Sequence, residues 1–210
     1  MDAVQSAVRG LRPLPRAHRT RHRRVRARTR RRLQLGVHAA PRVRRLRAER
    51  PWQEHRRFYV DLFADPGVLA AVWPRVTSRK QAEADALQLL AADVRHWQRR
   101  SFGPWVFFES ASGLFVGRGG LRATALAGRP CVELLYAVRP DRWGRGYATE
   151  MSALAITRAR ELGFSEVVGL AAVSNRASRR VLEKTGMRFD SDTIERAGLA
   201  HWVGRWRAIV

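Results

Sequence analysis

The chain has 210 residues, of which 45% are hydrophobic and 28% charged, a composition typical of an ordinary folded domain with or without an extension. Its longest apolar runs, such as residues 68–73, are far shorter than the roughly 18 residues of a membrane helix, which excludes a protein that spans a membrane by helices. A single cysteine, Cys131, excludes an internal disulfide framework and a cysteine-rich zinc site, and it makes a reducing cytoplasm the expected location.

The net charge of +23 is concentrated near the N-terminus. Residues 1–50 hold 17 arginines against Asp2 and Glu49, a net +15, which leaves +8 for the rest of the chain. Residues 9–32 have almost no acids and few apolar residues, so we expect residues 1–40 to be an arginine-rich, disordered extension. Three interpretations stay open: a tail in which residues 9–32 contact nucleic acid or the ribosome non-specifically, a start site placed too far upstream, and a targeting peptide.

An ordered domain is expected over residues 41–210, and its first half mixes strand and helix patterns. In chain order we predict a strand over residues 43–50, a helix over 52–64 that the Asp-Pro-Gly turn at 65–67 ends, and a helix over 78–99. Ser78 is the expected N-cap of the last helix, because its hydroxyl can accept from a first-turn N–H group.

The second half of the domain changes to the two-residue period of β-strands. We predict strands at 105–109, 114–122 and 132–138, a helix at 146–162, a strand at 166–172, a helix at 178–184, and strands at 187–190 and 201–206. The strand at 132–138 is apolar almost throughout, which is typical of a strand buried on both faces. The pattern therefore predicts an α/β layer architecture around one mixed sheet.

The most informative segment joins the apolar strand to the following helix and reads PDRWGRGYATE. A helix N-terminus carries unpaired N–H groups and partial positive charge, so it binds phosphate when small residues let a ligand approach. Gly144, Gly146 and Ala148 provide that access, and Arg142 and Arg145 add cations that can pair with phosphate oxygens. The alternative is a tight turn with solvated arginines, because the segment is neither a Walker loop nor a GxGxxG fingerprint.

A second motif, NRASRRVLEKTGM, begins at Asn175. Together the two motifs resemble the GNAT acyl-CoA N-acyltransferase superfamily and, within it, the ribosomal-protein N-terminal acetyltransferases RimJ and RimL. The first is similar to the pyrophosphate-binding motif of that family, and the second to its Asn-x-x-Ser, helix and Gly-aromatic signature. The resemblance covers about residues 42–207 and implies a GNAT-like fold, a central mixed and twisted β-sheet flanked by helices. Trp143 and Met187 depart from the commoner residues of the family, but neither change removes a phosphate donor.

The resemblance also implies acetyl-CoA as cosubstrate, with no metal. The diphosphate would lie on the backbone N–H groups of residues 145–149, and the pantetheine arm would pair like an added strand beside residues 136–138. A backbone N–H near Val138 could donate to the developing oxyanion. The implied cofactor-binding residues are Tyr136, Val138, Arg142, Gly144, Arg145, Gly146, Tyr147, Ala148, Thr149, Asn175 and Ser178.

Two residues are the catalytic candidates. Glu133 is the only acid in the strand at residues 131–138, where an unpaired carboxylate would be costly, and related enzymes often place a glutamate on this strand as general base. Its alternatives are a solvent-facing position or an ordinary ion pair. Ser178 is carried over from the Asn-x-x-Ser motif as the candidate acid for the departing thiolate or as a coenzyme contact. Asn175 would orient pantetheine or substrate, and both residues could instead cap the helix that they begin.

These implications describe an acetyl-CoA-dependent N-acetyltransferase that transfers an acetyl group to a primary amine by direct attack in a ternary complex. The amine could be a protein N-terminus or a small molecule such as an antibiotic or polyamine, because the acceptor loops expected at residues 66–80 and 190–200 match no substrate signature. The rival class is a basic RNA- or ribosome-binding protein that uses the fold as a non-catalytic scaffold. A monomer and a homodimer are both compatible with the sequence.

Overall fold

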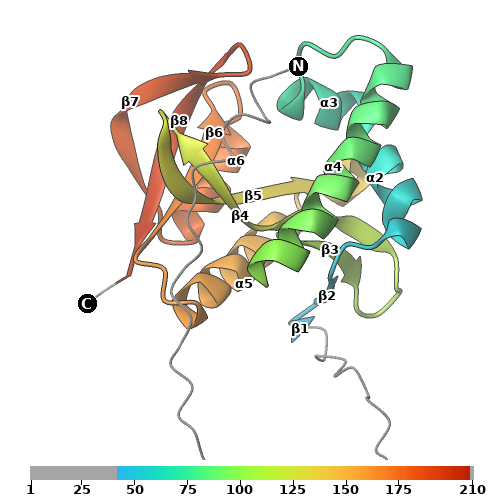
Figure 1. Cartoon of the computed structure of the whole chain (residues 1–210), viewed down its shortest axis with the longest axis horizontal. Coiled ribbons are helices and arrows are strands. Elements are labelled where there is room, and N and C mark those ends of the chain that lie inside the picture. The colour runs from blue at the N-terminus through green and yellow to red at the C-terminus, as the bar shows by residue number, and fades with distance from the viewer. Residues whose placement is uncertain (1–41, 209–210) are drawn as a thin grey trace, which may run out of the picture.

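The computed structural model describes residues 42–208, which form one eight-stranded sheet with helices on both faces (Figure 1). The strand order is β1-β2-β3-β4-β5-β6-β8-β7, and only the β5–β6 pair is parallel within these described residues. The strands are β1 (Arg42–Val43), β2 (Leu46–Glu49), β3 (Pro104–Glu109), β4 (Phe115–Leu126), β5 (Arg129–Val138), β6 (Glu166–Ala172), β7 (Arg188–Arg196) and β8 (Leu199–Arg207). The mixed α/β sheet is confirmed, whereas the predictions for residues 1–40 and 9–32 lie outside the described residues.

The connecting helices are η1 (Gln53–His55), α2 (Arg56–Phe63), α3 (Pro66–Val72), α4 (Arg79–Arg100), η2 (Pro140–Arg142), α5 (Tyr147–Glu161) and α6 (Arg176–Lys184). Side chains alternate between the faces of a strand, so neighbouring residues of β5 pack against different helices. Ala137 packs with α2 and α4, whereas Leu134 and Val138 pack with α5. Among the described residues, no helix is long and apolar enough to cross a membrane.

The helix predictions are largely confirmed, and the Asp-Pro-Gly turn shows where one was incomplete. The Ser78 hydroxyl caps α4 by accepting from the Gln81 N–H at 3.2 Å, as predicted. The turn at 65–67 ends α2 but also starts α3, because the Asp65 carboxylate accepts from the Gly67 N–H at 2.8 Å and Pro66 occupies the first turn. The expectation of an acceptor loop over residues 66–80 was therefore wrong for its first half.

Several strands differ in length from the prediction, because pairing in a hairpin satisfies backbone groups whatever the apolar pattern. The strand expected at 43–50 is divided into β1 and β2 by Arg44, whose φ is 41°. β5 starts at Arg129, three residues early, and β7 runs to Arg196 before a turn leads into β8. The loop expected at residues 190–200 is thus mostly a β-hairpin.

A buried charged network fixes β4 against the helices. The Tyr59 hydroxyl donates to Asp93 at 2.6 Å, and the Arg118 guanidinium donates to the same carboxylate at 2.5 and 2.6 Å. Burial alone would lower the pKa of Arg118, but the attraction of Asp93 outweighs it and raises that pKa. Removing one member would leave an uncompensated charge in the core, so the network locks α2, α4 and β4 together. Arg118 pairs with Ala137 of β5, and the network therefore also holds the strand that carries the candidate site.

The His96 side chain accepts a hydrogen bond from a backbone N–H group of β4 beyond the end of its pairing with β3. β3 pairs with β4 only as far as Gly120, and beyond that point the Ala123 N–H donates to the Nε2 atom of His96 at 3.0 Å. The other ring nitrogen, Nδ1, lies 2.7 Å from the Phe102 carbonyl oxygen. Because Nε2 accepts, Nδ1 carries the proton and the ring is neutral. Burial lowers the pKa of His96, which keeps the ring in this state.

We predict that His96 makes stability fall in mild acid. Its folded-state pKa lies below its unfolded value of about 6.5, so its contribution is present above that pH and is lost as the pH falls through the folded-state pKa. Urea unfolding between about pH 7.5 and pH 5 should show a steeper loss in the wild type than in His96→Gln, which cannot titrate. Parallel curves for the two proteins would contradict this role.

Candidate functional site

The sheet opens between its two parallel strands. β5 and β6 pair only at Glu133 with Val168 and at Leu134 with Gly169. Beyond that point β5 stays paired to β4 and β6 stays paired to β8, each to its last residue. Within the described chain, no strand pairs with the edge of residues 135–138 that faces β6. We call this edge the open edge of β5.

The open edge of β5 presents backbone donors. The Arg139 N–H donates to the Val116 carbonyl oxygen of β4 at 3.0 Å. Because N–H directions alternate along a strand, the N–H groups of Tyr136 and Val138 point the other way, toward β6. The Val138 carbonyl oxygen is occupied by the indole N–H of Trp143 at 2.7 Å. An extended chain laid beside this edge can therefore accept hydrogen bonds at two successive positions.

The N-terminus of α5 lies directly after the open edge. Gly144 and Gly146 have φ values of 75° and 81°, a left-handed conformation that only glycine adopts without strain. Gly146 is the N-cap and has no side chain to cover the first-turn N–H groups of this 15-residue helix. Arg145 is exposed beside it, and Ala148 and Thr149 follow in the first turn. The turn thus combines uncovered donors with the positive end of a helix, which is the arrangement that binds phosphate.

Two predicted contact residues, Arg142 and Tyr147, anchor this turn to β3. Tyr147 is buried and its hydroxyl donates to Glu109, while the Nη1 atom of Arg142 lies 3.9 Å from the same carboxylate. The Nε atom of Arg142 lies 3.4 Å from Asp141. Hydrogen bonds from Ser112 and from Tyr147 lower the pKa of Glu109 and keep it charged. Contact of Arg142 and Tyr147 with a coenzyme stays a prediction.

The start of α6 meets the open edge from the α5 side of the sheet. The Asn175 side-chain oxygen accepts from the Ser178 N–H at 2.9 Å, so Asn175 caps the helix. The Tyr136 hydroxyl donates to the Ser178 carbonyl oxygen at 3.1 Å, and because it has a single proton, it accepts from the Ser178 hydroxyl at 2.9 Å. Burial raises the pKa of Tyr136 to about 12, so its phenol stays protonated. The structure therefore brings Tyr136 together with Asn175 and Ser178, two residues of a motif about 40 residues further along the sequence.

Glu133 lies where the two parallel strands part. Its side chain is only 8% exposed and is held by Arg122 Nη2 at 2.8 Å and by Arg196 Nη1 at 2.9 Å. Burial alone would raise the pKa of Glu133, but the two arginines outweigh it and lower that pKa. The carboxylate is therefore ionised at neutral pH. Of the two structural alternatives, the ion pair is present and the solvent-facing position is wrong.

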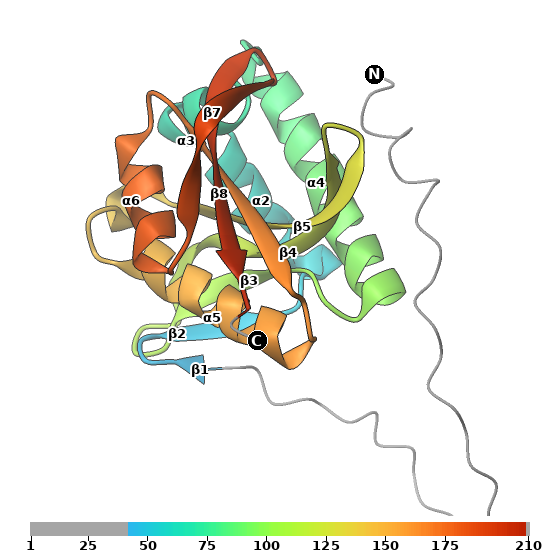
Figure 2. The same ribbon diagram turned by 90° about the vertical axis from the view of Figure 1, so that its left-hand side faces the viewer.

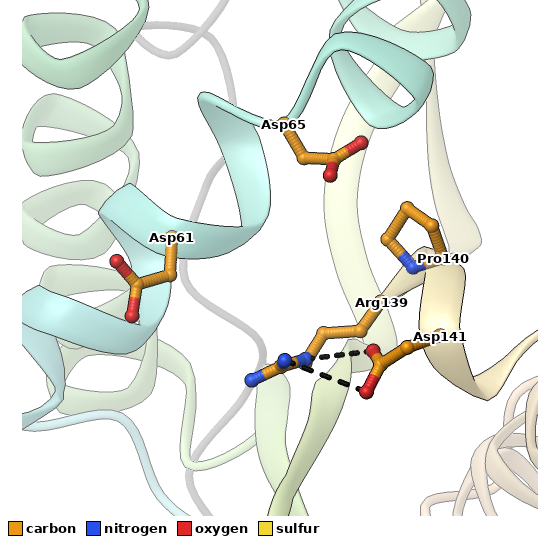
Figure 3. A pocket seen from close by; sticks show the side chains of 5 residues that line it. All are labelled: Asp61, Asp65, Arg139, Pro140 and Asp141. Carbon is orange, nitrogen blue, oxygen red and sulfur yellow. Dashed lines mark hydrogen bonds and ion pairs between the residues drawn. The ribbon is translucent and has the colours of Figure 1, made fainter.

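A cavity of about 370 Å³ lies beyond the C-terminal end of β5 (Figure 3). Asp61 and Asp65 line it from the α2 side, and Arg139, Pro140 and Asp141 line it from the turn. Arg139 Nε donates to Asp141 at 2.9 Å and Arg57 Nε lies 3.6 Å from Asp61, so arginines partly offset the three carboxylates of the lining. Within residues 42–208, no three His, Cys, Asp or Glu side chains are grouped so that they could hold a metal ion.

Sequence reasoning missed several side chains that shape the site. Trp143 was treated only as a departure from a family pattern, yet its indole N–H donates to the carbonyl oxygen of Val138, the last residue of β5. Glu109 ties the turn to β3, and Arg45 reaches the same turn from the β1–β2 connection. No local pattern marks Glu109 or Arg45, because their partners are 38 and 100 residues away in the sequence.

The family of the chain follows from its similarity to known proteins. Residues 45–188 match the family described as Acetyltransferase (GNAT) domain, and because this match covers more than half of the chain, the chain belongs to that family. This membership confirms the GNAT fold that the motifs implied.

Known relatives are similar at a distance. The uncharacterized protein YkkB of Bacillus subtilis (strain 168) is 30% identical over 93 residues, which are 44% of this chain and 54% of YkkB. The chain thus spans about half the length of this curated relative. An acetyltransferase from Agrobacterium tumefaciens str. C58 has a TM-score of 0.68 and 20% identity, covering 86% of this chain and 100% of its own. A putative GnaT-family acetyltransferase from Bordetella pertussis has a TM-score of 0.67 and 24% identity, covering 80% and 98%. At these identities both structures show the fold alone.

Proposed function

We propose that the chain is an acetyl-CoA-dependent N-acetyltransferase that transfers an acetyl group to a primary amine by direct attack in a ternary complex. The observation that carries this proposal is the open edge of β5 beside the N-terminus of α5, which places strand-like donors next to an anion site. Similar folds support it: YncA from Salmonella typhimurium was solved with its cofactor acetyl-CoA, and RimL was solved with coenzyme A.

In this proposal the backbone holds most of the coenzyme. The uncovered N–H groups at the first turn of α5 donate to the diphosphate, and exposed Arg145 adds a cation. The N–H groups of Tyr136 and Val138 donate to the pantetheine arm and to the thioester oxygen. When bound, acetyl-CoA supplies an activated acyl carbon at the open edge.

Glu133 is proposed as the base that removes a proton from the amine. Its carboxylate is ionised and therefore able to accept a proton, although the pairs with Arg122 and Arg196 lower its pKa and make it a weaker base. Three residues separate it from Tyr136, about 10 Å along an extended strand, and we therefore propose that it acts through water. Residues three apart project from opposite faces of a strand, and Tyr136 faces α6. Glu133 therefore lies on the α2–α4 side, and we propose that the amine enters there.

Ser178 is proposed to protonate the departing thiolate on the α6 side. In one step the Ser178 hydroxyl gives its proton to the sulfur and takes the proton of Tyr136, so that no alkoxide is left on Ser178. Tyr136 then regains a proton from water, because its pKa of about 12 keeps the phenol protonated near neutral pH. Asn175 fixes Ser178 through its backbone N–H.

We propose an acceptor from the classes of amine that are named for proteins of similar fold. RimL is titled a ribosomal L7/L12 alpha-N-protein acetyltransferase, with a TM-score of 0.59 and 17% identity. The spermidine N-acetyltransferase from Vibrio cholerae was solved with CoA and spermine, with a TM-score of 0.62 and 16% identity. The PDRWGRGYATE motif resembles that of the RimJ/RimL group, and the carboxylates that line the cavity beyond β5 suit either cationic amine. A screen of peptide N-termini, polyamines and aminoglycosides with labelled acetyl-CoA separates these acceptors, and acetylation of none of them would contradict the proposal.

We predict that acetyl-CoA raises the melting temperature and that Gly146→Val abolishes this shift. A bulky β-branched residue is strained at a φ of 81° and blocks the approach of the diphosphate. Gly128→Val is the matched control, because Gly128 has a φ of 76° in the distant β4–β5 turn. The control should keep the shift. An unchanged melting curve of the wild type at millimolar acetyl-CoA would sink the assignment.

We predict that Glu133→Gln lowers the acetylation rate by about 100-fold or more near neutral pH while acetyl-CoA binding persists, because glutamine keeps the shape and loses the basicity. Ser178→Ala should cost less, since water can replace a hydroxyl donor. Glu161→Gln, an exposed change on α5, is the control for charge removal. Turnover close to that of the wild type in Glu133→Gln would return this residue to a structural role.

The extension is proposed to be separable from a catalytic domain over residues 41–210, in a cytoplasmic monomer or homodimer. Deleting residues 1–38 should leave folding and acetyl-CoA binding intact, because an arginine-rich segment buries little apolar area. Any RNA binding through residues 9–32 should weaken steeply with salt and disappear on deletion. Loss of acetyl-CoA binding in the shortened protein would show that the extension packs on the domain.

A further inference from the structure

Arg45 lies in the β1–β2 connection and contacts the turn at residues 144–149. It lies between β1 and β2, which contact α5 along its side (Figure 2). Its Nε atom donates to the Glu150 carboxylate at 2.7 Å, and its Nη2 atom donates to the Arg145 carbonyl oxygen at 2.7 Å. Its guanidinium carbon lies 4.7 Å from the centre of the Tyr147 ring. One side chain therefore holds three successive parts of the turn and the first helical turn.

The bond to the Arg145 carbonyl sets the direction of a donor. The peptide group between Arg145 and Gly146 is planar and trans, so its C=O and N–H point in opposite directions. With the oxygen drawn toward Arg45, the Gly146 N–H points away from the β1–β2 turn. Glycine at a φ of 81° has wide conformational freedom, and without this anchor the peptide could rotate.

The bond to Glu150 also removes a repulsive charge. Glu150 lies in the first turn of α5, and its side chain is only 13% exposed. An unpaired carboxylate there would oppose a bound diphosphate at close range. The Arg45 guanidinium neutralises it through a pair that includes a contact at 2.5 Å. The turn thereby keeps the positive potential of the helix N-terminus.

We propose that Arg45 is a positioning residue for the coenzyme diphosphate, which acts by orienting the Gly146 N–H and by neutralising Glu150. This proposal rests on the proposed function, because it assumes that the turn at residues 144–149 holds the diphosphate. Arg45 acts through these two neighbours, and its loss should weaken coenzyme binding without removing an acid or a base from the reaction.

The test is the dissociation constant of acetyl-CoA, measured by calorimetry on the full chain, with inorganic pyrophosphate as a competing probe. Arg45→Ala should raise both constants about tenfold or more, because it removes a charge-assisted bond and frees Glu150. Arg44→Ala is the matched control: it removes the same charge from the neighbouring exposed residue and should change the constants less than about twofold. Arg45→Lys keeps the charge but loses the planar guanidinium that donates to two partners, so its affinity for acetyl-CoA should lie between those of Arg45→Ala and Arg44→Ala.

The double variant Arg45→Ala/Glu150→Gln separates the two effects. It should recover part of the lost affinity, because the repulsion is gone while the Gly146 peptide is still unanchored. Equal constants for Arg45→Ala and Arg44→Ala would overturn the proposal, and so would full recovery in Arg45→Lys, which would leave charge alone as the cause. If Arg45→Ala does not fold, the comparison of Arg45→Lys with Arg44→Ala decides. Failure of the wild type to bind acetyl-CoA would instead refute the proposed function.

Discussion

The two parallel strands of the sheet are held together at only two residue pairs, and the site depends on that constraint. If β5 and β6 were paired along their length, the N–H groups of Tyr136 and Val138 would be satisfied within the sheet and no edge would be left for a ligand. The strands can part because each keeps its antiparallel partner on the other side, β4 for β5 and β8 for β6. The backbone therefore remains ordered although it is open, which lets it bind without first paying an ordering cost.

Acidic residues hold arginines around this opening, in a chain that has far more basic than acidic residues. Glu133 joins β5 to Arg122 and Arg196, and Asp93 holds Arg118 under β4. Glu150 holds Arg45 at the start of α5. The pair of Glu133 with Arg122 joins the two strands of one hairpin, and the other pairs link elements that are not consecutive in the chain. Their shared consequence is a rigid frame in which the open edge of β5 and the N-terminus of α5 keep fixed positions.

The features that the sequence predicted well are those that local physics determines. The cap at Ser78, the bounds of β6 and the turn before α5 follow from hydrogen bonding or apolar spacing within a few residues. The turn at Gly146 could be recognised because a left-handed glycine and a helix start leave a mark in the sequence. The site residues near Tyr136 and Ser178 came from motif resemblance, and the sequence could not show that their hydroxyls meet.

The features that were missed depend either on partners far along the chain or on local signals that allow more than one structure. Arg45 and Glu150 are 105 residues apart, and nothing near either residue indicates the other. α3 was read as a loop because Asp65 and Pro66 stop one helix as readily as they start another. The hairpin of β7 and β8 was shortened in the prediction because its polar residues gain order from backbone pairing and not from burial.

The central claim is that the open edge of β5 and the N-terminus of α5 together hold acetyl-CoA. Amide hydrogen exchange with and without saturating acetyl-CoA tests it most directly, since it reports on single backbone N–H groups. The account predicts slower exchange at Tyr136 and Val138 and in the first turn of α5, with no change in the β4–β5 turn at Gly128. Unchanged exchange at Tyr136 and Val138 under saturation would contradict the account.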